Sequence, residues 1–150
     1  MALSFAARTD APLMLHAHTA SDLMAPNPIS IRAEAGITEA MTLFTEKGIH
    51  AAPVIDEAGH HLGVVSRSDI LRYDRERAWL PPPAEPPRAR GLMTPAVFSV
   101  KLDISAARVA EHMVELNVHR LFVVDDDGIL VGVITALDLL RHLCGQLPAG

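Results

Sequence analysis

The sequence predicts an α/β (α+β) fold in which one supersecondary unit occurs twice. Residues that matter for turns or chemistry recur 69 positions apart, as Met24 and Met93 do. The other marked pairs are Pro26 and Pro95, His50 and His119, Gly59 and Gly128, Gly63 and Gly132, and Asp69 and Asp138. Because no insertion or deletion separates these positions, we expect two repeats related by a pseudo-twofold axis, with related sites near that axis.

Each repeat is expected to fold in the order strand, helix, strand, strand, helix. A Leu-Met-x-Pro segment ends a short helical turn before the first strand, which is predicted over 29–31 and 97–100. The first helix ends at Lys47-Gly48 in one repeat and has Asp103 as its expected N-cap in the other. Two apolar strands follow, 52–55 and 62–65, with copies at 121–124 and 130–134. An acidic turn with glycine joins each pair, and the last helix begins at Ser66 or Thr135.

The repeats define the expected domain boundaries. Residues 1–18 are a tail or flanking segment, 19–73 the first repeat, 89–143 the second repeat and 144–150 a C-terminal tail. Residues 74–88 between the repeats include five prolines, which exclude an ordinary helix or a central strand. This segment is expected to be a semi-rigid linker.

Composition excludes several classes of function. The net charge of −5 argues against nucleic-acid binding, which needs a basic stripe. The single cysteine, Cys144, excludes an internal disulfide and is expected to lie as a small apolar residue in the last helix. No apolar run is long enough to span a membrane, and no secretion signal is recognised, so a cytoplasmic protein is expected.

The eight histidines do not predict a metal site. His60 and His61 are expected to be solvated in a turn, and no further ligands stand at zinc spacing. His112 and His142 are expected to be partly exposed on helices. The Asp125-Asp126-Asp127-Gly128 run lacks the later glutamate of a calcium loop and is better interpreted as a hairpin turn.

The segment from the last strand to the last helix admits two interpretations. Both copies have the pattern Gly-apolar-apolar-hydroxyl-x-x-Asp, from Gly63 through Ser66 to Asp69 and from Gly132 through Thr135 to Asp138. A hydroxyl followed three residues later by an acid is typical of a helix capping box. The same geometry offers an anion a helix N-terminus and offers a ribose a carboxylate, while glycine lets a flat ring approach the backbone.

These motifs together resemble the cystathionine-β-synthase (CBS) domain family. The segment from about Thr19 to Leu143 is similar to a tandem CBS pair, which is also called a Bateman module. The carrying residues are both Leu-Met-x-Pro segments, Ala52-Pro53-Val54-Ile55-Asp56, His119 to Asp125, and both hydroxyl-x-x-Asp segments. Phe122 stands where the family has a proline, as at Pro53, which is expected to alter local packing more than ligand chemistry. The resemblance implies two intertwined repeats, often paired into a disc-shaped homodimer, with clefts for AMP, ADP, ATP or S-adenosylmethionine.

The resemblance also implies the residues of two clefts. In the first, Asp69 would hold the ribose beside Ser66 and Ser68, with Val97 and Phe98 along the adenine. In the second, Thr135 and Asp138 would face Pro28 and Ile29. The phosphates would lie near the axis at His50, His119 and Arg120. Arg120 has no arginine counterpart, because Ala51 takes that place, and Ser68 gives the first cleft an extra hydroxyl; we therefore favour the Asp69 cleft.

The leading functional hypothesis is a non-catalytic regulatory module that senses adenosine-containing nucleotides and signals to an effector on another chain. No cofactor is required, and magnesium would accompany only a triphosphate. The alternative is a structural or dimerisation module with vestigial clefts. An enzyme is disfavoured, because no nucleophile–base pair, Walker loop or metal-ligand set is recognised.

Overall fold

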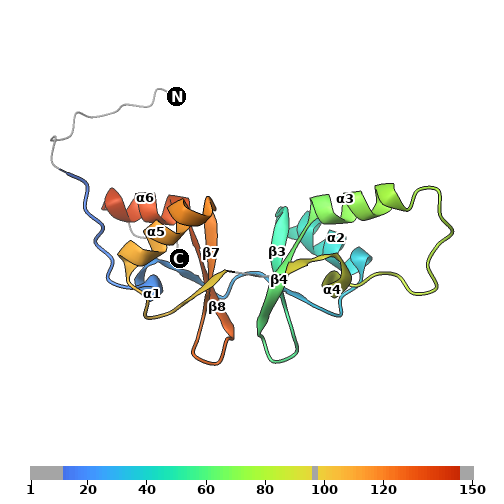
Figure 1. Ribbon diagram of the computed structural model, residues 1–150, viewed down its shortest axis with the longest axis horizontal. Helices are drawn as coiled ribbons and strands as arrows, with labels where there is room; N and C mark the ends of the chain where they lie inside the picture. The colour runs from blue at the N-terminus through green and yellow to red at the C-terminus, as the bar shows by residue number, and fades with distance from the viewer. Residues whose placement is uncertain (1–11, 96–97, 146–150) are drawn as a thin grey trace, which may run out of the picture.

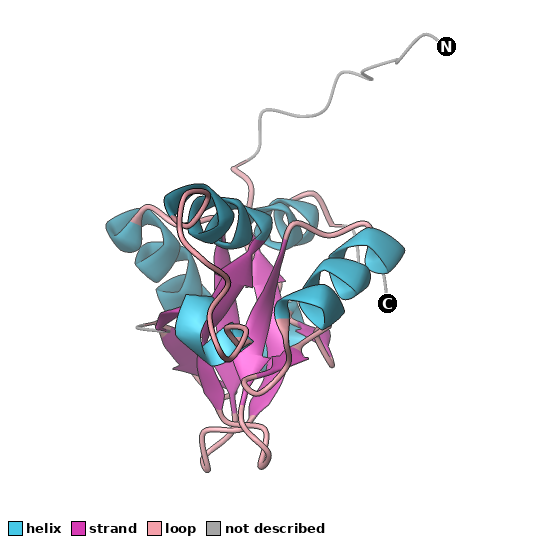
Figure 2. Cartoon of the chain, turned by 90° about the vertical axis from the view of Figure 1, so that its right-hand side faces the viewer, coloured by secondary structure: helices cyan, strands magenta, loops and turns pink. Residues whose placement is uncertain are grey.

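The structure, a computed structural model, describes residues 12–95 and 98–145 and has two similar α/β halves (Figure 1). The strands of both halves lie toward the middle of the molecule, and the helices lie toward its two ends and along one side (Figures 1 and 2). Each half contains a four-stranded sheet. The predicted α/β class and the duplication are confirmed.

The two sheets have equivalent strand orders. One is β2 (Ile31–Arg32), β3 (Ala51–Ile55), β4 (His61–Ser66) and β5 (Thr94–Pro95); the other is β6 (Ser99–Lys101), β7 (Arg120–Val124), β8 (Leu130–Thr135) and β1 (Ala25–Pro26). β3–β4 and β7–β8 are antiparallel hairpins, and β2 and β6 add to them in parallel. The hairpin turns contain Gly59 and Gly128 at positive φ, so the hairpin interpretation of Asp125–Gly128 is confirmed.

The short strands of the Leu-Met-x-Pro segments are exchanged between the repeats. β1, which belongs to the first repeat, pairs antiparallel with β8 of the second repeat. β5, which belongs to the second repeat, pairs antiparallel with β4 of the first. Pro26 lies opposite Gly132, and Pro95 lies opposite Gly63. Each sheet is therefore completed by the other repeat.

The helices before these strands are exchanged in the same way. α1 (Ala20–Leu23) belongs to a buried core with α5 (Ala106–Leu116), α6 (Ala136–Leu143) and the sheet of the second repeat. α4 (Ala89–Leu92) belongs to the core of α2 (Ile37–Lys47), α3 (Arg67–Glu76) and the sheet of the first repeat. Ala20, Leu23 and Ala89 are at most 3% exposed. Both hydrophobic cores thus depend on a segment from the other repeat.

Helix ends follow local signals with one exception. Gly48 ends α2 in the left-handed region, as predicted, and Asn117 ends α5 in the same conformation. The prediction of Asp103 as the N-cap of α5 is wrong. The cap is Ser105, whose hydroxyl accepts the N–H of Arg108, because the chain at Ile104 first accepts a backbone hydrogen bond from α1.

The first strand of each repeat begins later than predicted. Ile29 and Ser30 lie outside β2, and β6 begins at Ser99. The chain from β1 to β2 must pass from one sheet to the other, and its crossing uses Asn27 at positive φ. After α3, which extends to Glu76, the chain has no helix or strand until Ala89. Trp79 in this stretch is 95% exposed.

Gly63 and Gly132 are required by the close approach of the exchanged segments. A Cβ atom on Gly63 would lie 2.5 Å from the carbonyl oxygen of Thr94 and 2.8 Å from Met93 Sδ. A Cβ atom on Gly132 would meet the side chain of Met24. The space above each glycine is therefore filled by the Leu-Met-x-Pro segment, rather than left for the flat ring that the sequence suggested.

We expect Gly63→Ala to lower the free energy of unfolding by about 1–3 kcal/mol, the usual range for overpacking. Gly132→Ala should cost less, because its methyl group meets a flexible side chain instead of a backbone carbonyl. Urea denaturation measures both. Gly91→Ala is the matched control, since Gly91 lies in α4 with nothing within 4 Å of its Cβ position. Equal urea midpoints for Gly63→Ala and the unchanged protein would contradict this account.

Candidate functional site

Two cavities between the repeats form the candidate site. The first cleft, of about 320 Å³, is lined by His61, Val64, Thr94, Pro95, Phe98, Val118, Arg120, Leu121 and Phe122. The second cleft, of about 170 Å³, is lined by Pro28, Ile29, Ile49, Ala51, Pro53, Arg120, Phe122, Val133 and Thr135. Each draws its walls from both repeats.

The clefts are related by the 69-residue repeat but differ at its axis. Phe98, Val118 and Val64 of the first cleft correspond to Ile29, Ile49 and Val133 of the second. Arg120 and Phe122, in contrast, line both clefts. Their counterparts, Ala51 and Pro53, line only the second. The symmetry of the fold is therefore broken where the two clefts meet.

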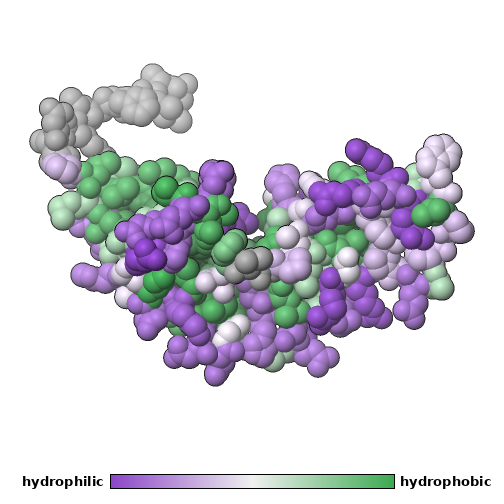
Figure 3. Space-filling model, viewed as in Figure 1, coloured by the Kyte–Doolittle hydropathy of each residue, from purple (hydrophilic) through white to green (hydrophobic). Residues whose placement is uncertain are grey.

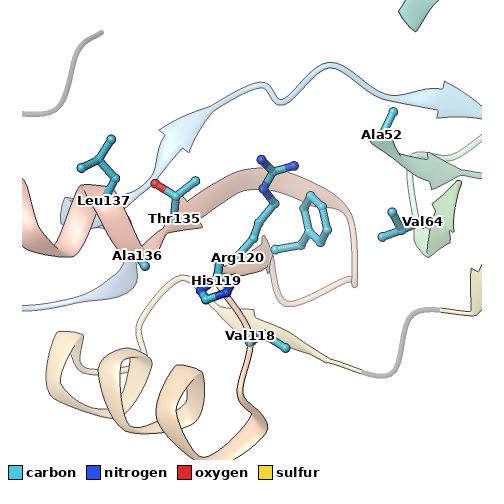
Figure 4. Close-up of a pocket in the computed structure, with 9 residues that line it drawn as sticks. Ala52, Val64, Val118, His119, Arg120, Thr135, Ala136 and Leu137 are labelled. Atoms are coloured by element: carbon cyan, nitrogen blue, oxygen red, sulfur yellow. The ribbon is translucent and has the colours of Figure 1, made fainter. Parts of the chain in front are cut away.

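A larger cavity of about 690 Å³ adjoins both clefts (Figure 4). Thr135, Ala136 and Leu137 lie on one side, at the start of α6, and Ala52 and Val64 of the first repeat lie on the other. The Arg120 side chain extends into the space between these walls, with His119 near its base. In Figure 3 the surface is hollowed between the two halves.

Both hydroxyl-x-x-Asp segments form complete capping boxes. The Ser66 N–H donates to Asp69 Oδ2 at 2.8 Å, and the Asp69 N–H donates to Ser66 Oγ at 3.2 Å. Thr135 and Asp138 repeat these contacts at 2.8 and 3.2 Å. The capping interpretation of the motif is confirmed.

The second carboxylate oxygen of each aspartate faces an arginine one turn later. Asp69 Oδ1 is 3.5 Å from Arg72, whose side chain is 65% exposed. Asp138 Oδ1 is 3.4 Å from Arg141, whose side chain is 36% exposed. The ion pair of Asp69 is therefore the more accessible of the two, and the more easily replaced by another partner.

The structure brings together only part of the predicted site. Phe98 and Arg120 line the first cleft, and Pro28, Ile29, Thr135 and Arg120 line the second. His119 lines the larger cavity. The remaining predicted residues that are described line neither cleft: His50, Gly63, Ser66, Ser68, Asp69, Gly132 and Asp138. Val97 lies outside the described residues. Roles for these side chains remain predictions.

His61 was misplaced by the sequence analysis. It lies in β4, on the wall of the first cleft, with its ring centroid 4.6 Å from that of Phe122. Its Nε2 is 3.1 Å from the Gly63 carbonyl oxygen, which can only accept, so Nε2 carries the proton. Burial lowers the pKa of His61. Its counterpart in the second repeat is the apolar Leu130, a signal that position 61 belongs to a strand.

Two further positions differ from expectation. His142, expected to be partly exposed, is 8% exposed on the inner face of α6. Cys144, expected within the last helix, is its exposed C-cap. Phe122 contacts His61 and also lines both clefts; its effect on packing, relative to the proline of the family, remains a prediction.

Comparison with known families identifies the two repeats. The CBS domain model matches residues 20–76 and again residues 89–145. The chain belongs to the CBS domain family. Its two CBS repeats form a tandem pair, as the sequence predicted.

Similar proteins include nucleotide-bound CBS pairs. CBSX2 in complex with AMP has a TM-score of 0.72 and 30% identity, covering 85% of this chain and 97% of that one. The CBS domain pair of MJ0100, in complex with 5′-methylthioadenosine and S-adenosyl-L-methionine, has a TM-score of 0.67 and 25% identity, covering 86% and 98%. The gamma-3 subunit of 5′-AMP-activated protein kinase from Bos taurus is 31% identical over 77% of this CBS pair. The match spans 24% of that subunit's own length.

No helix in the described part of the CBS pair has the length and apolar character to cross a membrane. No group of three or more His, Cys, Asp or Glu side chains within 12–95 and 98–145 is arranged to hold a metal ion.

The lowered pKa of His61 predicts a pH-dependent stability. The unfolded chain takes up a proton near pH 6.5 and the folded chain only at lower pH, so the free energy of unfolding should fall as the pH drops below about 6.5. We expect His61→Leu, which copies Leu130, to weaken this dependence. Urea denaturation at pH 7.5 and 5.5 compares the two proteins, with the partly exposed His112→Gln as control. An unchanged pH dependence in His61→Leu would contradict the assignment.

Proposed function

We propose that this CBS pair is a non-catalytic regulatory module that binds an adenosine-containing nucleotide, preferably in the first cleft. The observation that carries the proposal is the cavity itself. At about 320 Å³ it lies within the range of small-molecule sites, and its mostly apolar walls include one arginine. The second cleft, at about 170 Å³, lies below that range.

The chemistry of the first cleft suits an adenosine ligand. Phe98 is 50% exposed and offers an aromatic face on which adenine can stack, with Val97 as its expected neighbour. Arg120 can hold a phosphate group through two parallel hydrogen bonds. The ligands named for similar CBS pairs, AMP, 5′-methylthioadenosine and S-adenosyl-L-methionine, share this adenosine portion.

Asp69 can accept a hydrogen bond from a ribose hydroxyl while it still caps the start of α3. A carboxylate offers two oxygens with about four acceptor sites, and only Oδ2 is used by Ser66. The Oδ1 atom faces Arg72, an exposed side chain that a ribose hydroxyl could displace. Asp138 faces the less exposed Arg141, so a ribose would displace the partner of Asp69 more easily. Ser66 and Ser68 would assist Asp69, while Thr135, Pro28 and Ile29 would line the weaker site.

Signalling would use the junction of the two repeats. A ligand can shift a conformational equilibrium only if it binds one state more tightly. A nucleotide in the first cleft would contact Phe98 and Arg120 of the second repeat and Val64 of the first, so it would favour one arrangement of the repeats. We further propose a cytoplasmic homodimer that acts on an effector protein, with magnesium only beside a triphosphate and with His50 and His119 near the phosphates.

A structural or dimerisation module is the second candidate. Its support is that both aspartates already have a complete role as helix caps. In that case the clefts would be remnants of the duplication.

Thermal shift measurements separate these candidates. Saturating AMP, ADP, ATP or S-adenosylmethionine at about a hundredfold above the dissociation constant should raise the melting temperature by about 5–10 °C. Asp69→Ala and Asp138→Ala each remove one capping carboxylate, so each should lower the melting temperature of the free protein. We expect Asp69→Ala alone to lose most of the ligand-induced shift. No shift with any ligand would favour the structural module, and equal ligand shifts in both variants and the unchanged protein would exclude Asp69 from the site.

A further inference from the structure

We propose that the two clefts compete for Arg120, so that one chain binds one phosphate-bearing nucleotide tightly and a second only weakly. This inference rests on the proposed function. It adds that the clefts are not independent, and that their coupling comes from one side chain.

Arg120 is the shared positive charge of the site. Among the described residues that line the two clefts, it is the only lysine or arginine, and it lines both. Burial lowers the pKa of His61, and its Nε2–H donates to the Gly63 carbonyl oxygen. A phosphate in either cleft therefore depends on the same guanidinium.

The duplication left no second arginine to relieve this competition. Arg120 lies in β7 opposite Thr135, and its counterpart Ala51 lies in β3 opposite Ser66. Ala51 also lines the second cleft. An arginine side chain at position 51 would therefore extend from the backbone position in the first repeat that is equivalent to that of Arg120 in the second.

The charge of the phosphate groups makes binding of the second nucleotide less favourable. A phosphate monoester carries about −1.5 to −2 at pH 7, and a guanidinium pairs best with one such group in a bidentate geometry. A second phosphate in the other cleft would meet like charge without a free cation. Coupling of this kind typically changes affinity by about 5–150-fold. Adenosine carries no phosphate, so the same argument predicts no coupling between two adenosine molecules.

Cleft size gives a different expectation. If the small volume of the second cleft alone limited binding, adenosine would also bind only once. Ile29 on its wall is 43% exposed, however, and an exposed side chain changes rotamer within nanoseconds. The second cleft can therefore widen for a neutral ligand.

Isothermal titration calorimetry of the full chain with AMP and with adenosine tests the inference. We expect AMP to bind one site tightly and a second at least about tenfold more weakly. Adenosine should also bind two sites, with a smaller ratio between its two dissociation constants than AMP shows, because only AMP brings two phosphates to one guanidinium. In Arg120→Ala, AMP should lose its advantage over adenosine, and the ratio of its two dissociation constants should fall to that of adenosine.

Ala51→Arg is the gain-of-function test. Supplying the missing arginine should narrow the gap between the two AMP dissociation constants, because each phosphate would then have its own guanidinium. Arg108→Ala, an exposed arginine on α5 paired with Glu111, is the control for a change of charge alone and should behave like the unchanged protein. If Ala51→Arg does not fold, the comparison of Arg120→Ala with the unchanged protein decides.

The possible outcomes distinguish a failure of the competition between clefts from a failure of the proposed nucleotide binding. Two equal and independent AMP sites in the unchanged protein would overturn the competition, and so would a single adenosine site, which would assign the limit to cleft size. Either result would leave nucleotide binding intact. Absence of binding by both ligands would instead overturn the proposed function, and the inference with it.

Discussion

The exchange of the Leu-Met-x-Pro segments is the contact on which the rest of the structure depends. β1 and β5 each complete the sheet of the opposite repeat, and the helices before them enter the opposite core. The exchanged segments pack so closely against Gly63 and Gly132 that a side chain at either position would clash with them. Neither repeat can therefore be removed without exposing the core of the other. The clefts exist because this exchange holds two β-hairpins face to face near the axis.

The repeats differ at that axis in the residues that line the clefts. The buried framework keeps its apolar character in both copies, whereas Ala51 and Pro53 correspond to Arg120 and Phe122. The two larger side chains reach both clefts, so the second repeat supplies the charge and the aromatic surface for the whole site. A fold with twofold pseudo-symmetry thus carries an asymmetric candidate site, in which one cleft is larger and one arginine lines both.

The hydroxyl-x-x-Asp motif shows why a local pattern cannot separate structure from function. Ser66 and Asp69 satisfy backbone groups at the start of α3, as any capping box does. The same placement leaves the other carboxylate oxygen, Oδ1, facing the exposed Arg72 at 3.5 Å. Capping and ribose recognition require the same residues at the same spacing, so only ligand binding distinguishes them.

The sequence alone determined the duplication, the fold class and the order of elements, because these follow from local periodicity, turn residues and a constant repeat distance. It also indicated Arg120, Phe98, Pro28, Ile29 and Thr135 as neighbours of a cleft, through the family resemblance. Only the tertiary structure decided that His61 and Phe122 meet across the repeats and that Arg120 is shared by both clefts. These are contacts between residues far apart in the chain. They depend on how the two sheets face each other, which no local sequence signal encodes.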